Sequence, residues 1–300
     1  MHSETIWSSK EGEELQRTTA ARERMERELE IAREMQQSFL PQTLPEIPGV
    51  EIAASMHPAR EVGGDFYDVI PLSGERLGVL VADVADKGMP AALYMALART
   101  LLRAHSLSAR PQYLSDALES AQVRRLMRSG SLGALAALGA VRLTNEYLTE
   151  HHSESSMFLT LFYAVYNPQR RLLTYVNAGH NPPLLYNPFS GEHDWLRPTD
   201  MIIGVMPERL YEAQARQLSP GDVLVLYTDG VTEAFNADRE MFGVERLLEV
   251  VRTHHMASAR ELVEAIEAEV TAFAGEAPQS DDSTLLVVRC HSNGSQRSEA

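Results

Sequence analysis

Hydrophobic and polar positions follow different periods before and after residue 41. Residues 12–40 are dense in helix formers, and their apolar positions recur at alternating spacings of three and four. This spacing is typical of a coiled-coil seam, which three polar members weaken here. The seam positions are Leu15, Thr18, Arg22, Met25, Leu29, Ala32, Gln36 and Phe39. We therefore predict that residues 1–40 form a helical linker that joins two chains in a homodimer; the alternative is a single solvated helix packed on its own domain.

Strand patterns dominate after the proline-rich stretch at residues 41–49, which ends the helix. Residues 76–84, "RLGVLVADV", form an almost unbroken apolar run, as expected of a strand buried on both faces. Further strands are predicted at 50–58, 66–72, 157–179 (a hairpin around "NPQR"), 182–196 (a second hairpin), 221–230 and 281–290. Helices are predicted at 89–106, 243–255 and 259–275. Residues 107–156 look helical, with a break near 129–133, and carry no recognisable chemistry.

Charge and cysteine content narrow the classes of partner. A net charge of -15 argues against nucleic acid or an anionic membrane as the main partner. The longest apolar run, residues 131–141, is too short to span a bilayer. Cys290 is the only cysteine, and the first residues do not resemble a secretory signal. We expect a cytoplasmic protein.

Aspartates stand beside several apolar strands, where water is scarce. They are Asp65, Asp83, Asp229 and the pair Asp281 and Asp282. Carboxylates that converge on one site repel each other unless cations neutralise them. Because all the donors are oxygen atoms, with no histidine or cysteine at matching positions, Mg²⁺ or Mn²⁺ is favoured over Zn²⁺. Two such ions can activate water and hold a phosphate group for hydrolysis.

Several motifs in order resemble one enzyme family. They are "AREMQQSFLPQTLP", "VGGDFYDV", "VADVADKGMPAALYMALART", "FLTLFYAVYNPQRRLLTYVNAGHNPPLLY", "VLVLYTDGVTEAFN", "MFGVERL" and "SDDSTLLVVR". The chain resembles the PPM-type (protein phosphatase 2C-like) bacterial serine phosphatases, in the branch of stage II sporulation E and sigma-regulator phosphatases. The resemblance implies a phosphatase domain over residues 41–291, with an αββα sandwich of two mainly antiparallel sheets flanked by helices. Residues 292–300 would then be a flexible tail.

The same resemblance implies a function. The chain would use two Mn²⁺ or Mg²⁺ ions to hydrolyse phosphoserine or phosphothreonine on a regulatory protein. The expected substrate is a STAS-type anti-sigma-factor antagonist in a partner-switching pathway. A different class of function is a catalytically weak signalling module that binds its partner and transmits a dimer rearrangement. Loss of a metal-site aspartate would favour that class, and all of them are present.

Site residues follow from the motifs one by one. The resemblance implies that Asp65 binds one ion and that Asp83 bridges both, with the carbonyl of Val84 completing the first site. Asp229 and Asp281 would hold the second ion, and Asp282 competes with Asp281 for that role. Asp65, Asp83, Asp229 and Asp281 are thus the expected catalytic residues.

Four further positions near these motifs leave alternatives open. Asp68 could orient a ligand from behind or lie at the surface. His180 could approach the site or be a hydrogen-bonded structural residue in a tight turn. Where many family members read "GDVSGKG", this chain reads "ADVADKG", so that Asp86 adds an acid. Ala85 stands near the place where eukaryotic relatives carry a histidine, which favours water as the proton donor.

Overall fold

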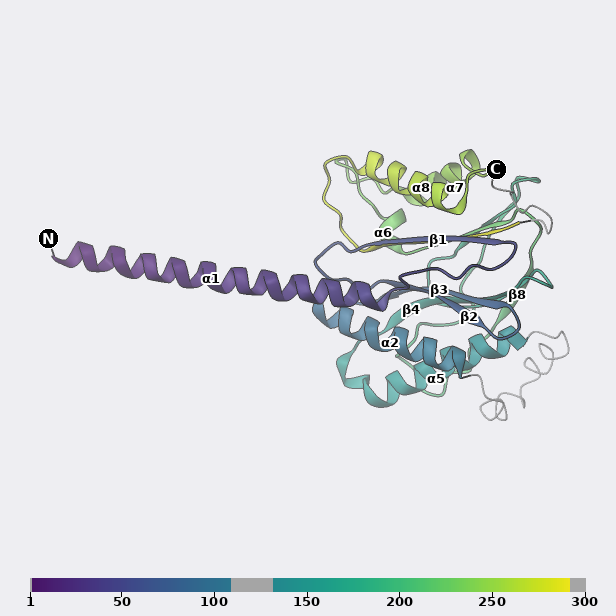
Figure 1. Ribbon diagram of the computed structural model, residues 1–300, viewed down its shortest axis with the longest axis horizontal. Coiled ribbons are helices and arrows are strands. Elements are labelled where there is room, and N and C mark those ends of the chain that lie inside the picture. The colour runs from purple at the N-terminus through teal and green to yellow at the C-terminus, as the bar shows by residue number, and fades with distance from the viewer. Residues whose placement is uncertain (1, 109–131, 292–300) are drawn as a thin grey trace.

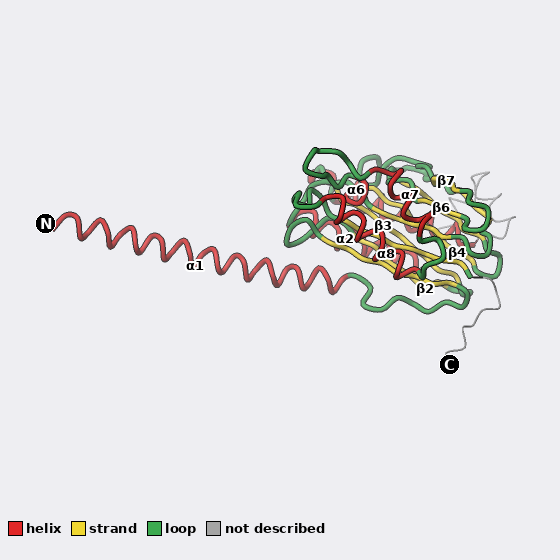
Figure 2. Tube along the Cα trace, turned by 90° about the horizontal axis from the view of Figure 1, so that it is seen from above, coloured by secondary structure: helices red, strands yellow, loops and turns green. Residues whose placement is uncertain are grey.

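Two five-stranded antiparallel sheets pack face to face, with helices on both outer faces (Figure 1). This computed structural model describes residues 2–108 and 132–291, with side chains from 18–108 and 135–291. The predicted tail, 292–300, and the predicted break near 129–133, apart from residues 132 and 133, lie outside the described residues. The layers in Figure 1 are the predicted αββα sandwich, and the view from above in Figure 2 shows helices lying over the strands.

The first sheet has the strand order β1-β10-β9-β6-β7. Its strands are β1 (Val50–His57), β10 (Ser283–Cys290), β9 (Val223–Tyr227), β6 (Leu184–Tyr186) and β7 (His193–Trp195). The second sheet has the order β2-β3-β4-β5-β8. Its strands are β2 (Phe66–Leu72), β3 (Arg76–Val84), β4 (Leu159–Asn167), β5 (Leu172–Ala178) and β8 (Gln214–Gln217). The sequence pattern did not predict β8, because its residues "QARQ" form no apolar run and are mostly exposed.

Helices cover the outer faces of both sheets (Figure 1). On the second sheet lie α2 (Met89–Leu107) and α5 (Leu132–His151), which is followed by a single 3-10 turn, η2 (Ser153–Ser155). On the first sheet lie α7 (Gly243–Thr253) and α8 (Ala259–Ala274), and α6 (Asp229–Thr232) is one turn directly after β9. The long helix α1 (His2–Phe39) extends away from one end of the sandwich (Figure 1).

Alternation along the strands builds three apolar layers. In β10, Leu286 and Val288 face the space between the sheets, whereas Leu285 and Val287 face α7 and α8. In β2, Phe66 and Ile70 likewise face the layer of α2 and α5. Successive side chains of a strand point to opposite faces, so central strands that are covered on both faces must be apolar throughout. This explains the unbroken apolar run of β3, which the sequence pattern correctly predicted.

None of the helices in residues 2–108 and 132–291 has both the length and the apolar composition that a membrane span requires.

Candidate metal centre

Antiparallel pairing gathers the predicted aspartates at one end of the sandwich. Asp65 directly precedes β2 and Asp83 lies near the end of β3, and the register pairs Phe66 with Ala82. In the other sheet, Asp229 follows β9 while Asp281 and Asp282 precede β10. Because neighbouring strands run in opposite directions, the start of one lies beside the end of the next. Figure 1 shows that α6, which begins at Asp229, lies at the end of the sandwich from which α1 extends.

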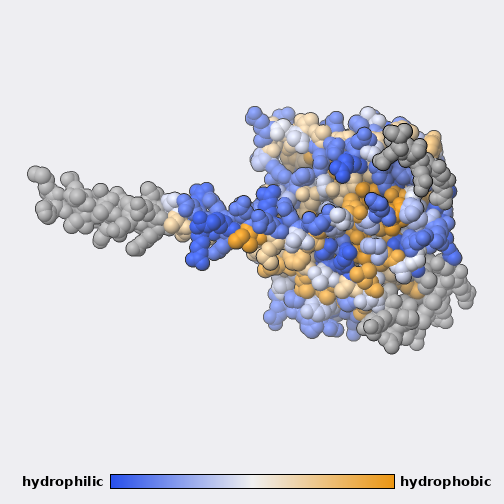
Figure 3. Space-filling view, in the orientation of Figure 1, coloured by the Kyte–Doolittle hydropathy of each residue, from blue (hydrophilic) through white to orange (hydrophobic). Residues whose placement is uncertain are grey.

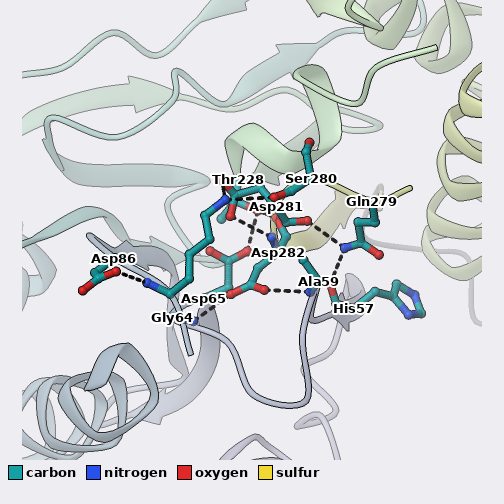
Figure 4. A network of polar contacts seen from close by, with 11 residues as sticks. His57, Ala59, Gly64, Asp65, Asp86, Thr228, Gln279, Ser280, Asp281 and Asp282 are labelled. Atoms are coloured by element: carbon teal, nitrogen blue, oxygen red, sulfur yellow. Dashed lines mark hydrogen bonds and ion pairs between the residues drawn. The ribbon is translucent and has the colours of Figure 1, made fainter. Parts of the chain in front are cut away.

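Asp65 joins the two sheets through hydroxyl groups. It is 1% exposed, and its Oδ2 accepts a hydrogen bond from Thr228 Oγ1 at 2.6 Å (Figure 4). The same oxygen accepts a hydrogen bond from Thr284 Oγ1 at 2.7 Å. Thr228 in turn accepts a hydrogen bond from the Thr284 backbone N–H at 2.9 Å. The carboxylate is therefore fixed in orientation by residues of the opposite sheet.

Asp282 holds the loop that precedes Asp65. Its Oδ1 accepts from the Ala59 N–H at 2.8 Å and its Oδ2 from the Gly64 N–H at 2.7 Å. A Cβ at Gly63 would lie 2.2 Å from Asp282 Oδ2, and one at Gly64 would lie 2.8 Å from the Val84 carbonyl oxygen. Only glycine fits so close to these groups. The two glycines let the backbone approach the acids.

The acids raise each other's pKa. Burial, then the charges of Asp83 and Asp282, raise the pKa of Asp65 well above its usual value. Burial and the charges of Asp229, Asp281 and Asp282 raise the pKa of Asp83 to about 7. The pKa of Asp229 is also raised, by burial and then by Asp281. The raised pKa values show that negative charge is in excess in this cluster.

Lys87 supplies positive charge from the loop after β3. Its Nζ donates to Asp281 Oδ2 at 2.7 Å and to the Ser280 carbonyl at 2.9 Å. Both side chains are about one-third exposed, at 38% and 36%, so solvent screens the pair.

The donor set fits a hard divalent cation. The gathered groups are carboxylates and the Val84 carbonyl, all oxygen donors of the kind that Mg²⁺ and Mn²⁺ bind. Their raised pKa values show that added positive charge would stabilise the ionised forms. Within residues 2–108 and 132–291, however, no three His, Cys, Asp or Glu side chains already converge on a metal-binding geometry. Hydrogen bonds from Thr228, Thr284 and Lys87 hold carboxylate oxygens that a cation would recruit.

Asp68 belongs to a different part of the structure from the other aspartates. It is fully buried on the side of β2 that faces α2, where Arg103 Nη1 lies 2.6 Å from its Oδ1 and Arg99 Nη2 lies 3.1 Å from its Oδ2. The suggestion of a surface residue is wrong, since the side chain alternates to the helix-facing side of the sheet and pairs with two arginines. None of the contacts just described joins it to the acids at the end of the sandwich.

His180 is a structural residue. It is 1% exposed, its Nε2 lies 3.1 Å from the Tyr227 carbonyl, and its Nδ1 lies 2.7 Å from Thr160 Oγ1. Since a carbonyl only accepts, Nε2 carries the proton and Nδ1 accepts from the threonine. Burial lowers the pKa of His180 to about 4, which keeps the ring neutral. The ring ties the turn after β5 to the ends of β4 and β9.

The residues that distinguish "ADVADKG" lie at the edge of the site. Asp86 is exposed, has a φ of 79°, and accepts the Lys87 backbone N–H at 2.8 Å through its Oδ1. The Ala85 N–H donates to the Phe158 carbonyl at 2.9 Å. The additional acid thus stabilises its own loop.

Sequence reasoning missed Thr228, Thr284 and Gln36. Both threonines adjoin predicted acids, in "YTDG" and "DDST", so their position was a usable signal. Gln36 was assigned to the seam of the helix, but its side chain is buried at the loop before Asp65, where it contacts Gly63.

Comparison with known proteins identifies the family. Residues 73–291 match the family described as stage II sporulation protein E (SpoIIE). The chain is 35% identical over 269 residues to protein IcfG of Synechocystis, covering 87% of this chain and 41% of IcfG. It is 28% identical over 262 residues to the phosphoserine phosphatase RsbU of Bacillus subtilis, covering 87% of this chain and 70% of RsbU. The chain thus spans less than half of the length of IcfG.

Solved structures share the fold. The SiaA-PP2C domain of Pseudomonas aeruginosa superposes with a TM-score of 0.71 at 24% identity, covering 90% of this chain and 98% of that domain. RsbX, solved in complex with magnesium, superposes with a TM-score of 0.54 at 16% identity, covering 83% of this chain and 98% of RsbX. The fold is that of PP2C-type phosphatase domains. The chain belongs to the SpoIIE family of bacterial serine phosphatases, a metal-dependent class.

Proposed function

We propose that this chain is a Mn²⁺- or Mg²⁺-dependent phosphatase that removes phosphate from serine or threonine of a regulatory protein. The main supporting observation is that Asp65, Asp83, Asp229 and Asp281 lie at strand ends on the same end of the sandwich, and that three of them have raised pKa values. Family membership supports the same reaction class, because RsbU is described as a phosphoserine phosphatase.

We assign the ligands from the partners that each acid already has. Asp83 would contribute to both ion sites, as the family resemblance implies, and its interaction with the charges of Asp229, Asp281 and Asp282 supports this assignment. The Val84 carbonyl, beside Gly64, and Asp65 would complete one site, and Asp229 and Asp281 the other.

The choice between Asp281 and Asp282 follows from their environments. Both oxygens of Asp282 accept backbone N–H groups of one loop, and the residue is 7% exposed. Asp281 accepts one backbone N–H, that of Asp282, at its Oδ1 at 3.0 Å, and its Oδ2 is held by the flexible Lys87 side chain, which can move away when another cation arrives. Asp281 is therefore the proposed ligand, and Asp282 organises the loop.

Bound at these carboxylates, Mn²⁺ or Mg²⁺ would acidify water and neutralise charge on a phosphoryl group. Other residues of the chain orient these ligands: Thr228 and Thr284 fix Asp65, and Asp282 fixes the glycine loop. Ala85 offers no titratable group, so protonation of the departing serine or threonine oxygen falls to water.

The substrate and the control of output rest on the family resemblance. We propose a phosphorylated STAS-type anti-sigma-factor antagonist as the substrate and α1 as a dimerisation helix. In support of dimerisation, α1 projects from the sandwich and exposes Met25, Ile31 and Met35 on a mainly hydrophilic surface (Figure 3).

A panel of phosphoproteins tests the substrate. STAS proteins from the same cell, phosphorylated on serine, are incubated with the chain and Mn²⁺, and phosphate release is measured beside phosphorylated proteins of other folds. Release at least about tenfold faster from one STAS protein, a difference of about 1.4 kcal/mol in barrier, is the expected result. Equal rates on all proteins would contradict the STAS assignment. Binding of a phosphorylated STAS protein without turnover would favour the signalling-module alternative.

A further inference from the structure

A cavity lies at the edge of the sandwich, between β2, α2 and the proline-rich segment that follows α1. Its volume is about 370 Å³, inside the range of roughly 300–1,000 Å³ that is typical of small-molecule sites. Because β2 is the outermost strand of its sheet, the cavity lies beside a strand edge. Three prolines and a valine give it apolar walls and two arginines give it charge: Pro41, Pro45, Pro71, Val69, Arg99 and Arg103. Among the residues that the structure describes, no acidic side chain lines it.

The two guanidinium groups share a single carboxylate. Arg103 Nη1 lies 2.6 Å from Asp68 Oδ1, and Arg99 Nη2 lies 3.1 Å from Asp68 Oδ2. Asp68 Oδ1 also accepts the Val69 N–H at 2.8 Å, so this oxygen already has two donors. Two positive charges against one negative charge leave one positive charge without a partner beside the cavity.

Arg99 has unused hydrogen-bonding capacity. Its side chain is only 11% exposed, and its buried Nε–H has no hydrogen-bond partner among the described residues. Burial lowers the pKa of Arg99, the charge of Asp68 raises it, and the charge of Arg103 lowers it again. A buried donor without a partner is costly, and hydrogen bonds between charged groups are among the strongest. An anion bound beside the two arginines would therefore be stabilised.

The walls of the cavity select the kind of anion. A guanidinium group is a planar fork of donors that matches a carboxylate. One monoanion balances the single uncompensated charge, whereas a dianion would leave negative charge in excess. The prolines favour an apolar body, because burying apolar surface beside them releases it from water. Proline also lacks an N–H, so these walls offer no backbone donor to a second polar group.

We propose that this cavity is a binding site for a small organic monocarboxylate, with the carboxylate against Arg103 and Arg99 and the apolar body against the prolines. The site is separate from the metal centre, since none of the contacts that build it involves the acids at the end of the sandwich. The inference is therefore independent of the proposed phosphatase activity.

Benzoate serves as the probe, and it is titrated into the full chain in EDTA. Calorimetry gives the dissociation constant, and the methyl NMR signals of Val69 report whether the probe enters this cavity. Benzamide has the same shape without the charge, and inorganic phosphate has charge without the apolar body. Arg103→Gln removes one guanidinium group, and Arg260→Gln makes the same change at an exposed position of α8 as the matched control. Arg103→Lys is measured in parallel, because it keeps the charge beside Asp68 if the glutamine variant does not fold.

Wild type should bind benzoate with a dissociation constant of about 1 mM or tighter, with a shift of the Val69 signals. Benzamide and inorganic phosphate should each bind at least about tenfold more weakly than benzoate. Arg103→Gln should weaken benzoate binding by roughly tenfold or more. Arg103→Lys should weaken it less, because the charge remains without the planar fork. Arg260→Gln should match wild type.

Three results would overturn the proposal. The first is benzamide that binds as tightly as benzoate, and the second is wild-type benzoate affinity in both Arg103 variants. The third is a set of Val69 signals that benzoate leaves unchanged at ten times the expected dissociation constant. Inorganic phosphate that binds as tightly as benzoate would overturn the choice of a carboxylate.

Discussion

Each aspartate at the end of the sandwich has a different set of partners. Asp65 accepts two threonine hydroxyls and Asp282 accepts two backbone N–H groups of the glycine loop, whereas Asp281 accepts the Lys87 ammonium and the backbone N–H of Asp282. These partners distinguish Asp281 from Asp282, which are adjacent in sequence and identical in residue type. The distinction leads to opposite expectations for Asp281 and Asp282.

Asp281→Asn should weaken Mn²⁺ binding and leave the metal-free fold nearly as stable as wild type. Asp282→Asn should instead destabilise the metal-free protein by about 1–3 kcal/mol, because an amide NH₂ would face a backbone N–H donor and leave it unsatisfied. Urea unfolding in EDTA, followed by Mn²⁺ titration, separates the two effects. Equal losses of stability in both variants would contradict the assignment of Asp282 to the loop.

The raised pKa of Asp83 predicts a pH dependence of the metal-free protein. Its pKa rises from 3.8 to about 7 on folding, so the folded protein binds this proton more tightly than the unfolded chain. The contribution of this proton to stability is fully present below about pH 4 and is lost as the pH rises through about 7. As the pH rises from about 4 to about 7, the free energy of unfolding of Asp83→Asn should therefore decrease less than that of wild type.

Urea unfolding in EDTA at several pH values measures this difference. His180, whose pKa is lowered to about 4, contributes stability that is lost as the pH falls toward 4. That residue is present in both proteins, so its effect cancels when variant and wild type are compared. If the stability of the two proteins changed with pH in the same way, the pKa of Asp83 would not be raised on folding, and the prediction would be contradicted.

At the scale of single elements, α2 is joined to β2 by a buried ion-pair cluster. Asp68 is fully buried and contacts both Arg99 and Arg103, one helical turn apart. Burial lowers the pKa of Arg99, and the charge of Asp68 partly restores it. Removing one partner of a buried pair leaves a charge without compensation.

Asp68→Asn should therefore destabilise the protein by about 3 kcal/mol without changing its affinity for Mn²⁺. Urea unfolding gives the first quantity and Mn²⁺ titration the second. Thr100→Ala, on the exposed side of α2, provides a helix control. Loss of Mn²⁺ binding in a folded Asp68→Asn protein would contradict this expectation and show that Asp68 contributes to the metal centre.

Helix α1 has too little apolar surface to be stable in isolation, since single helices are marginal in water. We expect a parallel dimer, and Met25→Glu combined with Leu29→Glu should dissociate it by placing like charges at the seam. Met25 is 64% exposed, so the change removes little packing within one chain. Ala20→Glu places a charge on a different face and should leave the dimer intact. Light scattering at several concentrations measures the mass, and a wild-type protein that stays monomeric contradicts the dimer.

At the scale of the whole molecule, periodicity was enough to predict most of the sandwich. Continuous apolar runs marked β3, β9 and β10, because strands covered on both faces have no polar side. The polar edge strand β8 and the single turn α6 had no such signal. The positions of the acids at strand ends were enough to predict that they share one site. The contacts of Asp68 and Gln36 could not be predicted in this way, because they depend on the direction in which each of these side chains points. That direction follows from packing across elements far apart in sequence.

The most direct test of the account is Mn²⁺-dependent hydrolysis of a small aryl phosphate, which depends on the centre and not on the protein substrate. Wild type should turn over only with Mn²⁺ or Mg²⁺. The turnover rate of Asp229→Asn should be lower by a factor of about 100 or more, while its circular dichroism is unchanged. Each ~1.4 kcal/mol of lost transition-state stabilisation lowers the rate tenfold. Asp86→Asn, which removes the same charge from an exposed position in the adjoining loop, should keep wild-type activity. Wild-type turnover by Asp229→Asn, or turnover by wild type that is unchanged in EDTA, would contradict the metal centre.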